Sequence, residues 1–290
     1  MDPSRRPSPP TITLTSDFGT RDGYAAAMKG VILGICPDAR LVDISHDLPA
    51  HDIAHAAFVL GAACRFFPPE TIHLAVVDPG VGTERRPLLL TTPTGSYVAP
   101  DNGLLTYIVA GHETMKGPST SEERNGDTFL KPAFRPVPEG CQAYVLDREE
   151  YWAEAVSDTF HGRDVFAPVS AHLSAGIAPD RTGTVTGKVL CLDIQAPSER
   201  RGIIAGRIIY VDHFGNLVSN IRFDEQPSAE IQVEIDDRRI RGLSRSYEGG
   251  KGLMAVIGSH GYLEVALGKG SAAQALGATV GAEVKVLVKP

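Results

Sequence analysis

The sequence predicts an α/β domain with a largely parallel sheet, followed by a smaller all-β domain built as an antiparallel sheet or barrel. In residues 11–180, short apolar runs alternate with stretches in which apolar residues recur every three or four positions. This alternation is typical of parallel strands covered by helices on both faces. From residue 184 onward, short β-rich runs are separated by Gly, Asn or Asp, and no long helical pattern is present. This pattern of short strands and turns is typical of a small antiparallel sheet or barrel.

The expected elements of the first domain follow from these patterns. Strand candidates are the apolar runs at 11–16, 39–45, 71–78, 87–92 and 96–100. Helix candidates lie at 22–35, 51–67 and 164–176. Asp22 is placed to cap the first helix, because Asp is a favoured residue at helix N-termini. His51 and His55 would lie one turn apart on the second helix.

Three further segments complete the predicted domain organisation. Residues 1–10, MDPSRRPSPP, are expected to be a disordered leader without the hydrophobic region of a secretory signal. Residues 111–142 are polar, rich in Pro and Gly, and without periodicity. A loop of this length is usually an insertion, either functional or neutral. The all-β domain is expected to span residues 184–290.

The composition restricts the class of partner. The 290-residue chain has a net charge of −7, which argues against nucleic acid or an anionic membrane as a partner. No apolar run reaches the roughly 18 residues that span a bilayer. The four cysteines show no CxxC spacing, so we expect ordinary thiols in a reducing cytoplasm.

Polar residues follow four of the predicted strands. They are Asp17, then Asp43 with His46, then Asp78, and finally Asp101 with Asn102. Because ligands bind at the carboxyl ends of the strands in an open parallel sheet, these residues are candidates for a common site. Each one taken alone could instead cap a helix or stabilise a turn.

Several kinds of site are disfavoured by missing motifs. The sequence has no GxGxxG or GxxxxGK[ST] after a strand, which argues against a bound pyrophosphate or triphosphate. Since a carboxylate can accept hydrogen bonds from ribose hydroxyls, Asp17 still permits a nucleoside. The segment HDIAH at 51–55 is not the HExxH pattern of zinc proteases, so no metal is expected. No GxSxG elbow is present for a serine nucleophile.

Two other segments carry candidate chemistry. In TFHGRD, His161 could serve as a general acid or base, or equally as a capping or core residue. In DHFGN, Phe214 offers a stacking face and Asn216 can read an adenine edge. The alternative for DHFGN is a hairpin turn with a buried aromatic ring.

Taken together, the motifs resemble the S-adenosyl-L-methionine (SAM) hydroxide adenosyltransferases, or SAM hydrolases, which are relatives of the fluorinase and chlorinase. The matching segments are TSDFGTRDGY, DISHDLP, VVDPGVGTERR, APDNGLL, TFHGRDVFAP, DHFGNLVSN and GSHGYLEVA, in this order. The resemblance implies attack of water or hydroxide on the ribose C5′ of SAM, which gives adenosine and L-methionine without a cofactor or metal. It also implies a homotrimer with active sites between subunits.

The resemblance assigns roles to individual residues. A water-handling triad maps onto Asp78, Arg85 and His161, which leaves Arg86 as an expected surface residue. The substrate-binding positions are Asp17 for the ribose, His51 near the sugar, Asp22 and Asp212 for the methionine ammonium, Phe214 and Asn216 for adenine, Ser259 near the methionine carboxylate, and Asn102. Held by Arg85, Asp78 is expected to orient water rather than to act as a strong base.

The sequence departs from the family pattern at three places. His260 stands where serine or arginine is more usual, Ser271 stands where asparagine is frequent, and the insertion at 111–142 is long. Two alternatives therefore stay open, a non-catalytic module that binds adenosine or SAM and a halide-using adenosyltransferase. The halogenases lack the Asp and His of the triad, so Asp78 and His161 favour water over halide.

Overall fold

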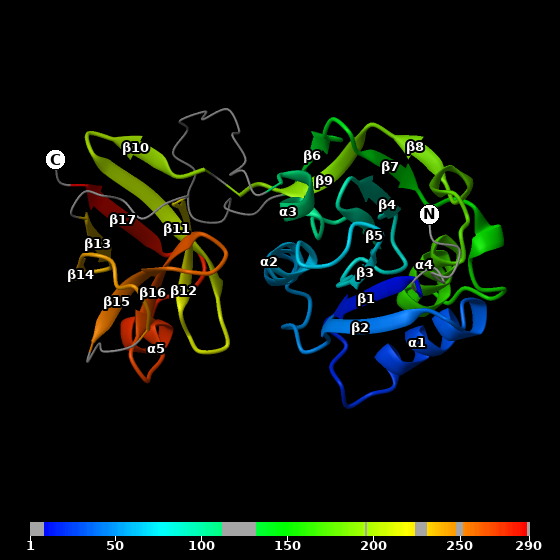
Figure 1. The fold of residues 1–290 in the computed structure, drawn as a ribbon, viewed down its shortest axis with the longest axis horizontal. Coiled ribbons are helices and arrows are strands. Elements are labelled where there is room, and N and C mark those ends of the chain that lie inside the picture. The colour runs from blue at the N-terminus through cyan, green and yellow to red at the C-terminus, as the bar shows by residue number, and fades with distance from the viewer. Residues whose placement is uncertain (1–8, 112–131, 195, 224–230, 248–251, 289–290) are drawn as a thin grey trace, which may run out of the picture. The chain divides into compact units, whose positions relative to one another are not determined.

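The chain forms two compact units (Figure 1). The computed structural model describes residues 9–111, 132–194, 196–223, 231–247 and 252–288. The first unit contains the described residues up to Leu192, and the second contains those from Asp193 onward. Most of the expected leader, and residues 112–131 of the expected insertion, lie outside the described residues.

The first unit is built on a seven-stranded sheet with the order β2-β1-β3-β5-β4-β7-β8. Its strands are β1 (Thr11–Ser16), β2 (Arg40–Ser45), β3 (Ile72–Val76), β4 (Pro87–Thr92), β5 (Gly95–Pro100), β7 (Gln142–Val145) and β8 (Thr184–Thr186). Strands β2, β1, β3 and β5 are parallel to one another, whereas β4, β7 and β8 are antiparallel to their neighbours. The predicted parallel strands β2, β1, β3 and β5 are thus adjacent, and antiparallel strands extend the sheet on the β5 side, so the sheet as a whole is mixed. Only residues 93 and 94 separate β4 from β5, and a link this short can form only a hairpin.

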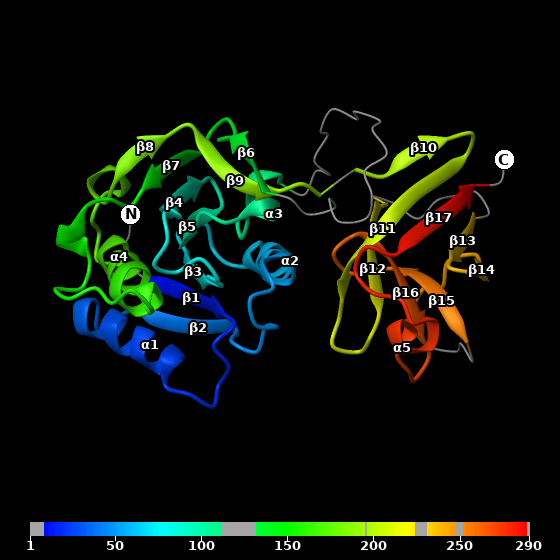
Figure 2. The ribbon, with the colours of Figure 1, turned by 180° about the vertical axis from the view of Figure 1, so that it is seen from behind.

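Helices cover both faces of this sheet (Figures 1 and 2). They are α1 (Tyr24–Ile35), α2 (Ile53–Cys64), the single turn α3 (Thr106–Val109) and α4 (Ala167–Ser174). Helices α1 and α4 share one apolar core with Val98 of β5. Tyr97, the residue before Val98 in β5, points to the opposite face, and its hydroxyl donates to the Cys64 sulfur of α2 at 3.6 Å. Because successive side chains of a strand point to opposite faces, α2 packs on the other side of the sheet.

Two helix starts differ from the sequence prediction. Helix α1 begins at Tyr24, its N-cap is Gly23, and no side chain bonds to this end of the helix, so Asp22 is not its cap. His51 lies before α2 with φ at 65°, and the α2 N-cap is Asp52, which accepts from the His55 backbone N–H at 2.9 Å. Because the helix begins only after Asp52, His51 does not lie on a helical face and belongs to the preceding loop.

The first unit extends beyond residue 180. The second half of the expected insertion contains β6 (Pro132–Pro136), which pairs with β9 (Lys188–Leu192) in an antiparallel ladder. Strand β8 pairs with β7 of the main sheet. Residues 184–192 therefore belong to the first unit, although their β-rich texture resembles that of the second. A short-range sequence pattern cannot show which strand is the partner.

The second unit is an antiparallel sheet with the order β14-β13-β17-β11-β12-β16-β15, as the sequence predicts. Its elements are β10 (Ser198–Arg200), β11 (Ile203–Val211), β12 (Leu217–Arg222), β13 (Ile231–Ile235), β14 (Arg238–Arg241), β15 (Leu253–Ile257), β16 (Tyr262–Leu267), α5 (Ala272–Leu276) and β17 (Glu283–Val288). The two edge strands β14 and β15 contact each other, so the sheet is nearly closed into a barrel around its apolar core.

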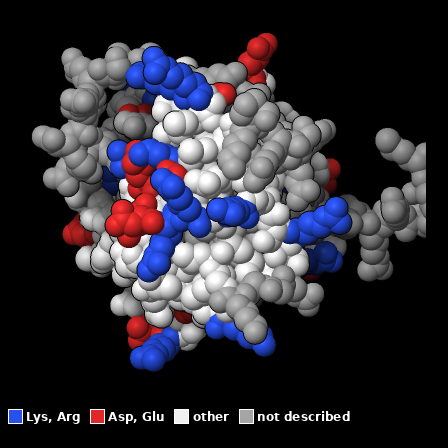
Figure 3. All heavy atoms as spheres, turned by 90° about the vertical axis from the view of Figure 1, so that its left-hand side faces the viewer, with Lys and Arg blue, Asp and Glu red and all other residues white. Residues whose placement is uncertain are grey.

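The surface of the second unit mixes both signs of charge. Figure 3 shows Lys and Arg side chains beside Asp and Glu side chains on this face. Two of the ion pairs on strands of this unit are Arg239 with Glu234 at 2.9 Å and Lys285 with Glu283 at 2.9 Å. A face of mixed sign does not present the single-sign basic patch that binds nucleic acid. Within the described residues, no helix is long and apolar enough to cross a membrane.

Candidate active site

A cavity of about 310 Å³ lies at the carboxyl ends of β1 and β3 in the first unit. Because β2, β1, β3 and β5 run parallel, the polar residues that follow them meet at one edge of the sheet. The residues that line the cavity include four of the predicted site residues, namely Asp17, His51, Asp78 and His161. The structure thus brings together residues that are up to 144 positions apart (161 − 17).

The centre of this site is the guanidinium of Arg85. Its Nε donates to Asp78 Oδ1 at 2.9 Å, and its Nη2 donates to Asp78 Oδ2 in a second, short bond. The same Nη2 lies 2.8 Å from His161 Nδ1. The side chains of Asp78 and Arg85 are only 6% and 9% exposed. A bidentate arginine–carboxylate pair of this kind, shielded from water, fixes the carboxylate in one orientation.

A tight turn brings Arg85 back to Asp78. Gly82 has φ at 75°, a conformation that glycine adopts without steric cost. A Cβ atom at this position would lie 2.7 Å from the Asp158 carbonyl oxygen. The turn therefore packs directly on the segment that carries His161. This close approach explains why glycine is needed at position 82 of DPGVGTER.

The contact with Arg85 defines the protonation of His161. An arginine only donates, so Nδ1 of His161 must accept and the ring proton resides on Nε2. Burial lowers the pKa of His161, and the positive charge of Arg85 lowers it further. The imidazole is therefore neutral at pH 7, with an N–H that can donate.

Asp164 holds the loop that carries His161. Its carboxylate accepts from the Ser157 backbone N–H at 2.9 Å, from the Ser157 hydroxyl at 2.7 Å and from Arg163 Nε at 2.6 Å. Burial raises the pKa of Asp164, but the hydrogen bonds from Arg163 and Ser157 outweigh it and leave the pKa lowered. A buried, ionised carboxylate thus ties residues 157–164 together. Sequence reasoning missed this role, because Asp and Arg before a helix are also typical of a simple cap.

Asp17 and His51 meet on the wall of the cavity. One carboxylate oxygen of Asp17 accepts from the His51 backbone N–H at 2.8 Å. Beside them, the rings of Phe18, Tyr24 and Phe160 pack on one another with centroid distances of 5.2 to 5.8 Å. The cavity therefore combines a carboxylate anchor with an aromatic wall.

The structure places the other predicted residues of this unit differently. Asp22 is exposed and is not one of the residues that line the cavity. Asn102 uses its amide on the backbone, because its Nδ2 donates to the Val77 carbonyl at 2.8 Å and its Oδ1 accepts from Leu104 at 3.2 Å. Asn102 therefore acts on the site indirectly, by fixing the residue that precedes Asp78.

Arg86 is not the surface residue that the sequence predicts. It forms an ion pair with Asp101, whose side chain is 1% exposed. Its guanidinium also lies 5.0 Å from the ring of Phe134 in β6 and donates to the Lys188 carbonyl of β9. The second oxygen of Asp101 accepts from the Leu190 backbone N–H at 2.7 Å. Arg86 and Asp101 thus join the β6–β9 ladder to the main sheet, so the two adjacent arginines have separate tasks.

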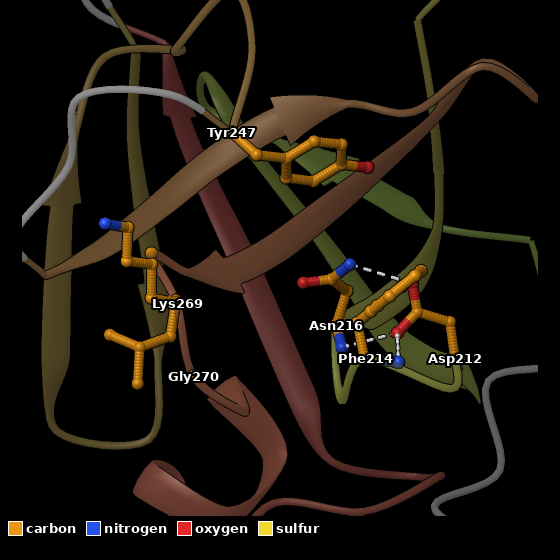
Figure 4. A pocket seen from close by; sticks show the side chains of 8 residues that line it. Asp212, Phe214, Asn216, Tyr247, Lys269 and Gly270 are labelled. Atoms are coloured by element: carbon orange, nitrogen blue, oxygen red, sulfur yellow. Dashed lines mark hydrogen bonds between the residues drawn. The ribbon is translucent and has the colours of Figure 1, made fainter.

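The second unit has its own cavity, of about 490 Å³, shown in Figure 4. The residues that line it are Asp212, Phe214, Asn216, Tyr247, Leu267, Gly268, Lys269 and Gly270. Three of them are predicted substrate-binding residues. Tyr247 and Lys269 were not predicted, because no motif marks an isolated tyrosine or lysine in a β-rich segment.

The predicted residues of this cavity lie on the β11–β12 hairpin turn. Asp212 Oδ1 accepts from the backbone N–H groups of Phe214 and Asn216 at 2.9 and 2.8 Å, and its Oδ2 accepts from the Asn216 side chain at 2.8 Å (Figure 4). The turn is a hairpin, as one alternative held, but Phe214 is 75% exposed rather than buried. An exposed ring held on a rigid turn is available to stack on a ligand.

A buried carboxylate lies beneath this cavity. Glu264 is 3% exposed and accepts from the Tyr247 hydroxyl at 2.6 Å, and His260 Nε2 lies 3.0 Å from its other oxygen. Burial raises the pKa of Tyr247, and the hydrogen bond to Glu264 raises it further. The departure from the family pattern at His260 therefore places an imidazole on a buried acid.

Ser259 and Ser271 lie away from the centre of this cavity. Ser259 is exposed in the turn between β15 and β16, at the end of β16 opposite to Gly268–Gly270. Ser271 caps α5 by accepting from the Gln274 backbone N–H at 3.1 Å. A Cβ on Gly215 would lie 2.0 Å from the Ser271 hydroxyl, so the helix cap packs against the hairpin turn.

The described residues contain no group of three or more His, Cys, Asp or Glu side chains that could hold a metal ion. The four cysteines are free thiols. Burial raises the pKa of Cys191 to about 12 and also raises the pKa of Cys64. Because the thiolate is the reactive form, these two buried thiols are inert.

Comparison with known families identifies the protein class. Residues 12–183 match the model of the SAM hydroxide adenosyltransferase N-terminal domain, and residues 206–285 match that of the C-terminal domain. The chain belongs to this family. The predicted resemblance, the two-domain fold class and the enzyme class, transfer of an adenosyl group to hydroxide, are thereby confirmed.

Individual relatives agree with this assignment. The chain is 34% identical to the (R)-S-adenosyl-L-methionine hydrolase of Methanocaldococcus jannaschii over 88% of its length and 87% of the relative's. It is 35% identical to the enzyme of that name from Thermus thermophilus, over 95% and 99% of the two chains. A fluorinase from an Actinoplanes species is a more distant relative at 28% identity. A crystal structure of an uncharacterised Thermotoga maritima protein superimposes with a TM-score of 0.79 at 30% identity, covering 95% and 99% of the two chains.

Proposed function

We propose that this SAM hydroxide adenosyltransferase converts SAM and water to adenosine and L-methionine by in-line attack on the ribose C5′. The observation that carries the proposal is the arrangement of Asp78, Arg85 and His161, in which one guanidinium fixes both a carboxylate and a neutral imidazole at a cavity. Such a set can hold one water molecule in one orientation. It offers no activated nucleophile of the protein itself.

The chemistry needs positioning more than strong base catalysis. As the water oxygen bonds to C5′, the C5′–S bond breaks, and its electron pair neutralises the sulfonium to give the thioether of methionine. The oxygen then loses a proton, which Asp78 accepts and passes to solvent. Holding a reactant in line for attack can supply about 7–11 kcal/mol of the barrier in favourable cases. The N–H on Nε2 of His161 can donate a hydrogen bond to the water, whereas the Asp78 carboxylate accepts one from it.

The two cavities divide the substrate between them. In this proposal, Asp17 accepts from the ribose hydroxyls in the first unit and His51 lies near the sugar. In the second unit, Phe214 stacks on adenine and Asn216 reads its edge. The methionine end is assigned to the carboxylates of Asp22 and Asp212 and to Ser259. The last three assignments rest on the resemblance, since Asp22 and Ser259 line neither of these two cavities and Asp212 already bonds its own turn.

A homotrimer provides a way to join the two halves. The family resemblance implies three subunits with each active site formed by the first unit of one chain and the second unit of its neighbour. This arrangement is supported by the distribution of the predicted residues, since neither cavity holds the triad and the adenine contacts together. A heterologous interface repeated three times closes into a ring.

The names of the relatives add a finer proposal about the substrate. Two of them are (R)-S-adenosyl-L-methionine hydrolases, so we propose that this chain also takes the epimer with the (R) configuration at sulfur. Incubation with each separate sulfur epimer tests this. We expect faster loss of the (R) epimer, and equal or faster loss of the (S) epimer contradicts it.

The overall reaction is tested by incubating the purified protein with SAM and separating nucleosides by chromatography. We expect adenosine and methionine in equal amounts, with no loss of activity when a chelator is present. Intact SAM after incubation would reject the proposal in favour of a binding module. A 5′-halo-adenosine formed on addition of chloride or fluoride would instead select a halide-using adenosyltransferase.

Variants of the triad test the assigned roles. Alanine at Asp78, Arg85 or His161 is expected to lower kcat by about 10-fold or more, within the range for groups that handle protons. Glu84→Ala provides a matched control, because Glu84 is exposed in the same turn. Turnover at the control's rate in all three triad variants would remove these residues from the mechanism.

A further inference from the structure

A chain of hydrogen bonds runs behind the wall of the first cavity. The Ser16 hydroxyl lies 2.6 Å from His46 Nδ1, and His46 Nε2 lies 3.1 Å from Asp43 Oδ1. Asp43 Oδ2 accepts from Lys29 at 2.7 Å. Ser16 is fully buried and the His46 side chain is 3% exposed, whereas Asp43 is 43% exposed. The chain thus leads from the surface to the end of β1.

The direction of these bonds is determined by chemistry. Burial raises the pKa of Asp43, but the hydrogen bonds from Lys29 and His46 lower it by more, so this carboxylate is ionised and only accepts. In the singly protonated ring, the proton then lies on Nε2, and Nδ1 accepts from the Ser16 hydroxyl. This leaves the lone pairs of the serine oxygen for the Phe18 backbone N–H at 3.4 Å.

The chain is tied to Asp17 from both sides. Ser16 precedes Asp17 and, through its oxygen, holds the Phe18 backbone that follows it. The Gly19 backbone N–H donates to the His46 carbonyl at 2.7 Å, which joins the two loops directly. The His46 loop then continues to His51, whose N–H donates to the Asp17 carboxylate. A displaced His46 would therefore disturb both the backbone around Asp17 and its hydrogen-bond donor.

The set has the residue types of a serine-hydrolase triad but not its chemistry. Ser16 is fully buried and is not among the residues that line the cavity. In addition, Ser16 contacts Nδ1 of the imidazole, whereas a triad serine transfers its proton to Nε2. A nucleophilic role is therefore excluded, and a role through Asp17 remains.

We propose that Ser16, His46 and Asp43 are positioning residues that set the carboxylate of Asp17 for the ribose hydroxyls. This inference rests on the proposed contact between Asp17 and the ribose. A carboxylate binds a diol well only when its oxygens are aligned with both hydroxyl groups, so a shift of well under 1 Å weakens the binding of the ribose. Asp43 and His46 thereby have a role that differs from the capping or turn role considered for them from the sequence.

The test compares two ligands by calorimetry, adenosine and 2′,3′-dideoxyadenosine, which lacks both ribose hydroxyls. The wild-type protein is expected to bind adenosine about 10- to 100-fold more tightly, the range for hydrogen bonds to a charged group. Ser16→Ala and His46→Ala are expected to lower this ratio by about 10-fold while affinity for the dideoxy ligand stays unchanged. A buried network that served stability alone would leave the ratio unchanged or weaken both ligands equally.

The same strand offers a matched control. Thr13 of β1 makes a second buried hydroxyl–imidazole contact, with His73 Nδ1 at 2.8 Å, but it is remote from Asp17. Thr13→Val should therefore keep the wild-type ratio. His46→Asn places an acceptor near the position of Nδ1 and should recover part of the ratio that His46→Ala loses. If the buried variants do not fold, Asp43→Ala tests the chain from its exposed end, with a smaller expected loss of about 3-fold.

The outcomes separate this inference from the proposed reaction. A wild-type ratio retained by Ser16→Ala, His46→Ala and Asp43→Ala overturns the positioning role alone. A wild-type protein that binds both ligands equally overturns the Asp17–ribose contact and this inference with it, while SAM turnover can still be observed. If the variants lower the affinity ratio but the wild-type protein never forms adenosine from SAM, the positioning role is supported and the proposed reaction is rejected.

Discussion

At the residue scale, Arg85 connects the two functional groups of the site. Its guanidinium binds both oxygens of Asp78 and one nitrogen of His161, and it packs 5.0 Å from the ring of Phe166. A lysine could not make this set of contacts, because it carries a single point charge without a fork. Because an arginine only donates, this contact requires His161 to be neutral, with its ring proton on Nε2.

Activity should fall at acid pH as His161 gains a proton. Protonated Nδ1 cannot accept from Arg85, and the two groups would then be adjacent cations. Because burial and Arg85 lower the pKa of His161 below 6.5, the neutral form and the activity persist above that lowered pKa and are lost below it. The measurement is kcat/KM as a function of pH, with the half-point expected below 6.5. In His161→Asn this acid limb should disappear or move, and an identical limb in the variant contradicts the account.

At the element scale, the strands were more predictable than their partners. The bounds of β1 and β4 coincide with the predicted runs at 11–16 and 87–92, because each run is rich in Thr, Ile or Leu and is followed directly by a turn segment that contains Gly. The pairing of β6 with β9 was not predicted, since it joins residues about 55 positions apart. Nothing local in the sequence specifies such a partner. The loop position of His51 was missed for a different reason, because the positive φ of this residue does not alter the helical pattern of apolar residues.

The site was predictable where motifs carry it and not where tertiary contacts do. Asp78 and Arg85 could be assigned together, because both lie in one segment seven residues apart. The contacts of Glu264 with Tyr247 and of Ser16 with His46 were not predictable, since each depends on a chain reversal between distant segments. The residue pattern alone marked Asp78 at the end of a strand and left His161 open, and the resemblance supplied the triad of Asp78, Arg85 and His161.

The turn between β3 and β4 should not tolerate a side chain at Gly82. Gly82→Ala combines a φ of 75° with a Cβ only 2.7 Å from a carbonyl oxygen. We expect a loss of about 1–3 kcal/mol in the free energy of unfolding, and a lower kcat because the turn carries Arg85. Denaturation in urea and SAM turnover measure the two effects. Gly80→Ala is the control, since the nearest atoms to its Cβ would lie at an ordinary 3.4 Å; equal stability of the two variants contradicts the role of the close packing.

The core of the first sheet should make stability depend on acid pH. His73 of β3 is fully buried, and burial lowers its pKa from 6.5 to about 4. The unfolded chain therefore binds a proton between pH 6.5 and pH 4 that the folded chain does not, and stability decreases as the pH falls through this window. The contribution is about 3 kcal/mol. Urea denaturation from pH 7 to pH 4 measures it, and His73→Gln should reduce the slope; an unchanged slope would show that other groups cause it.

At the scale of the whole molecule, the predicted contacts are divided between two units. The triad and Asp17 belong to the first unit, and the adenine contacts belong to the second. In the proposed assignment, each cavity alone therefore offers only part of the contacts to SAM. The proposed trimer joins complementary halves from neighbouring subunits, and this arrangement can be tested without a further structure.

Two inactive variants should restore activity when they share an oligomer. Asp78→Ala damages the first cavity and Phe214→Ala the second, so each homotrimer is expected to be impaired. When the two chains are co-produced in equal amounts, about one quarter of the sites formed between subunits receive two intact halves. SAM turnover of the purified mixed oligomer measures this recovery. A mixture no more active than its parents would place the site within one chain.

The central claim is that water is the nucleophile and C5′ is the atom attacked. The most direct measurement is turnover of SAM in ¹⁸O-labelled water, followed by mass spectrometry of both products. The account predicts one ¹⁸O atom in the 5′-hydroxyl of adenosine and none in methionine. Unlabelled adenosine, or a label found in methionine, would contradict it.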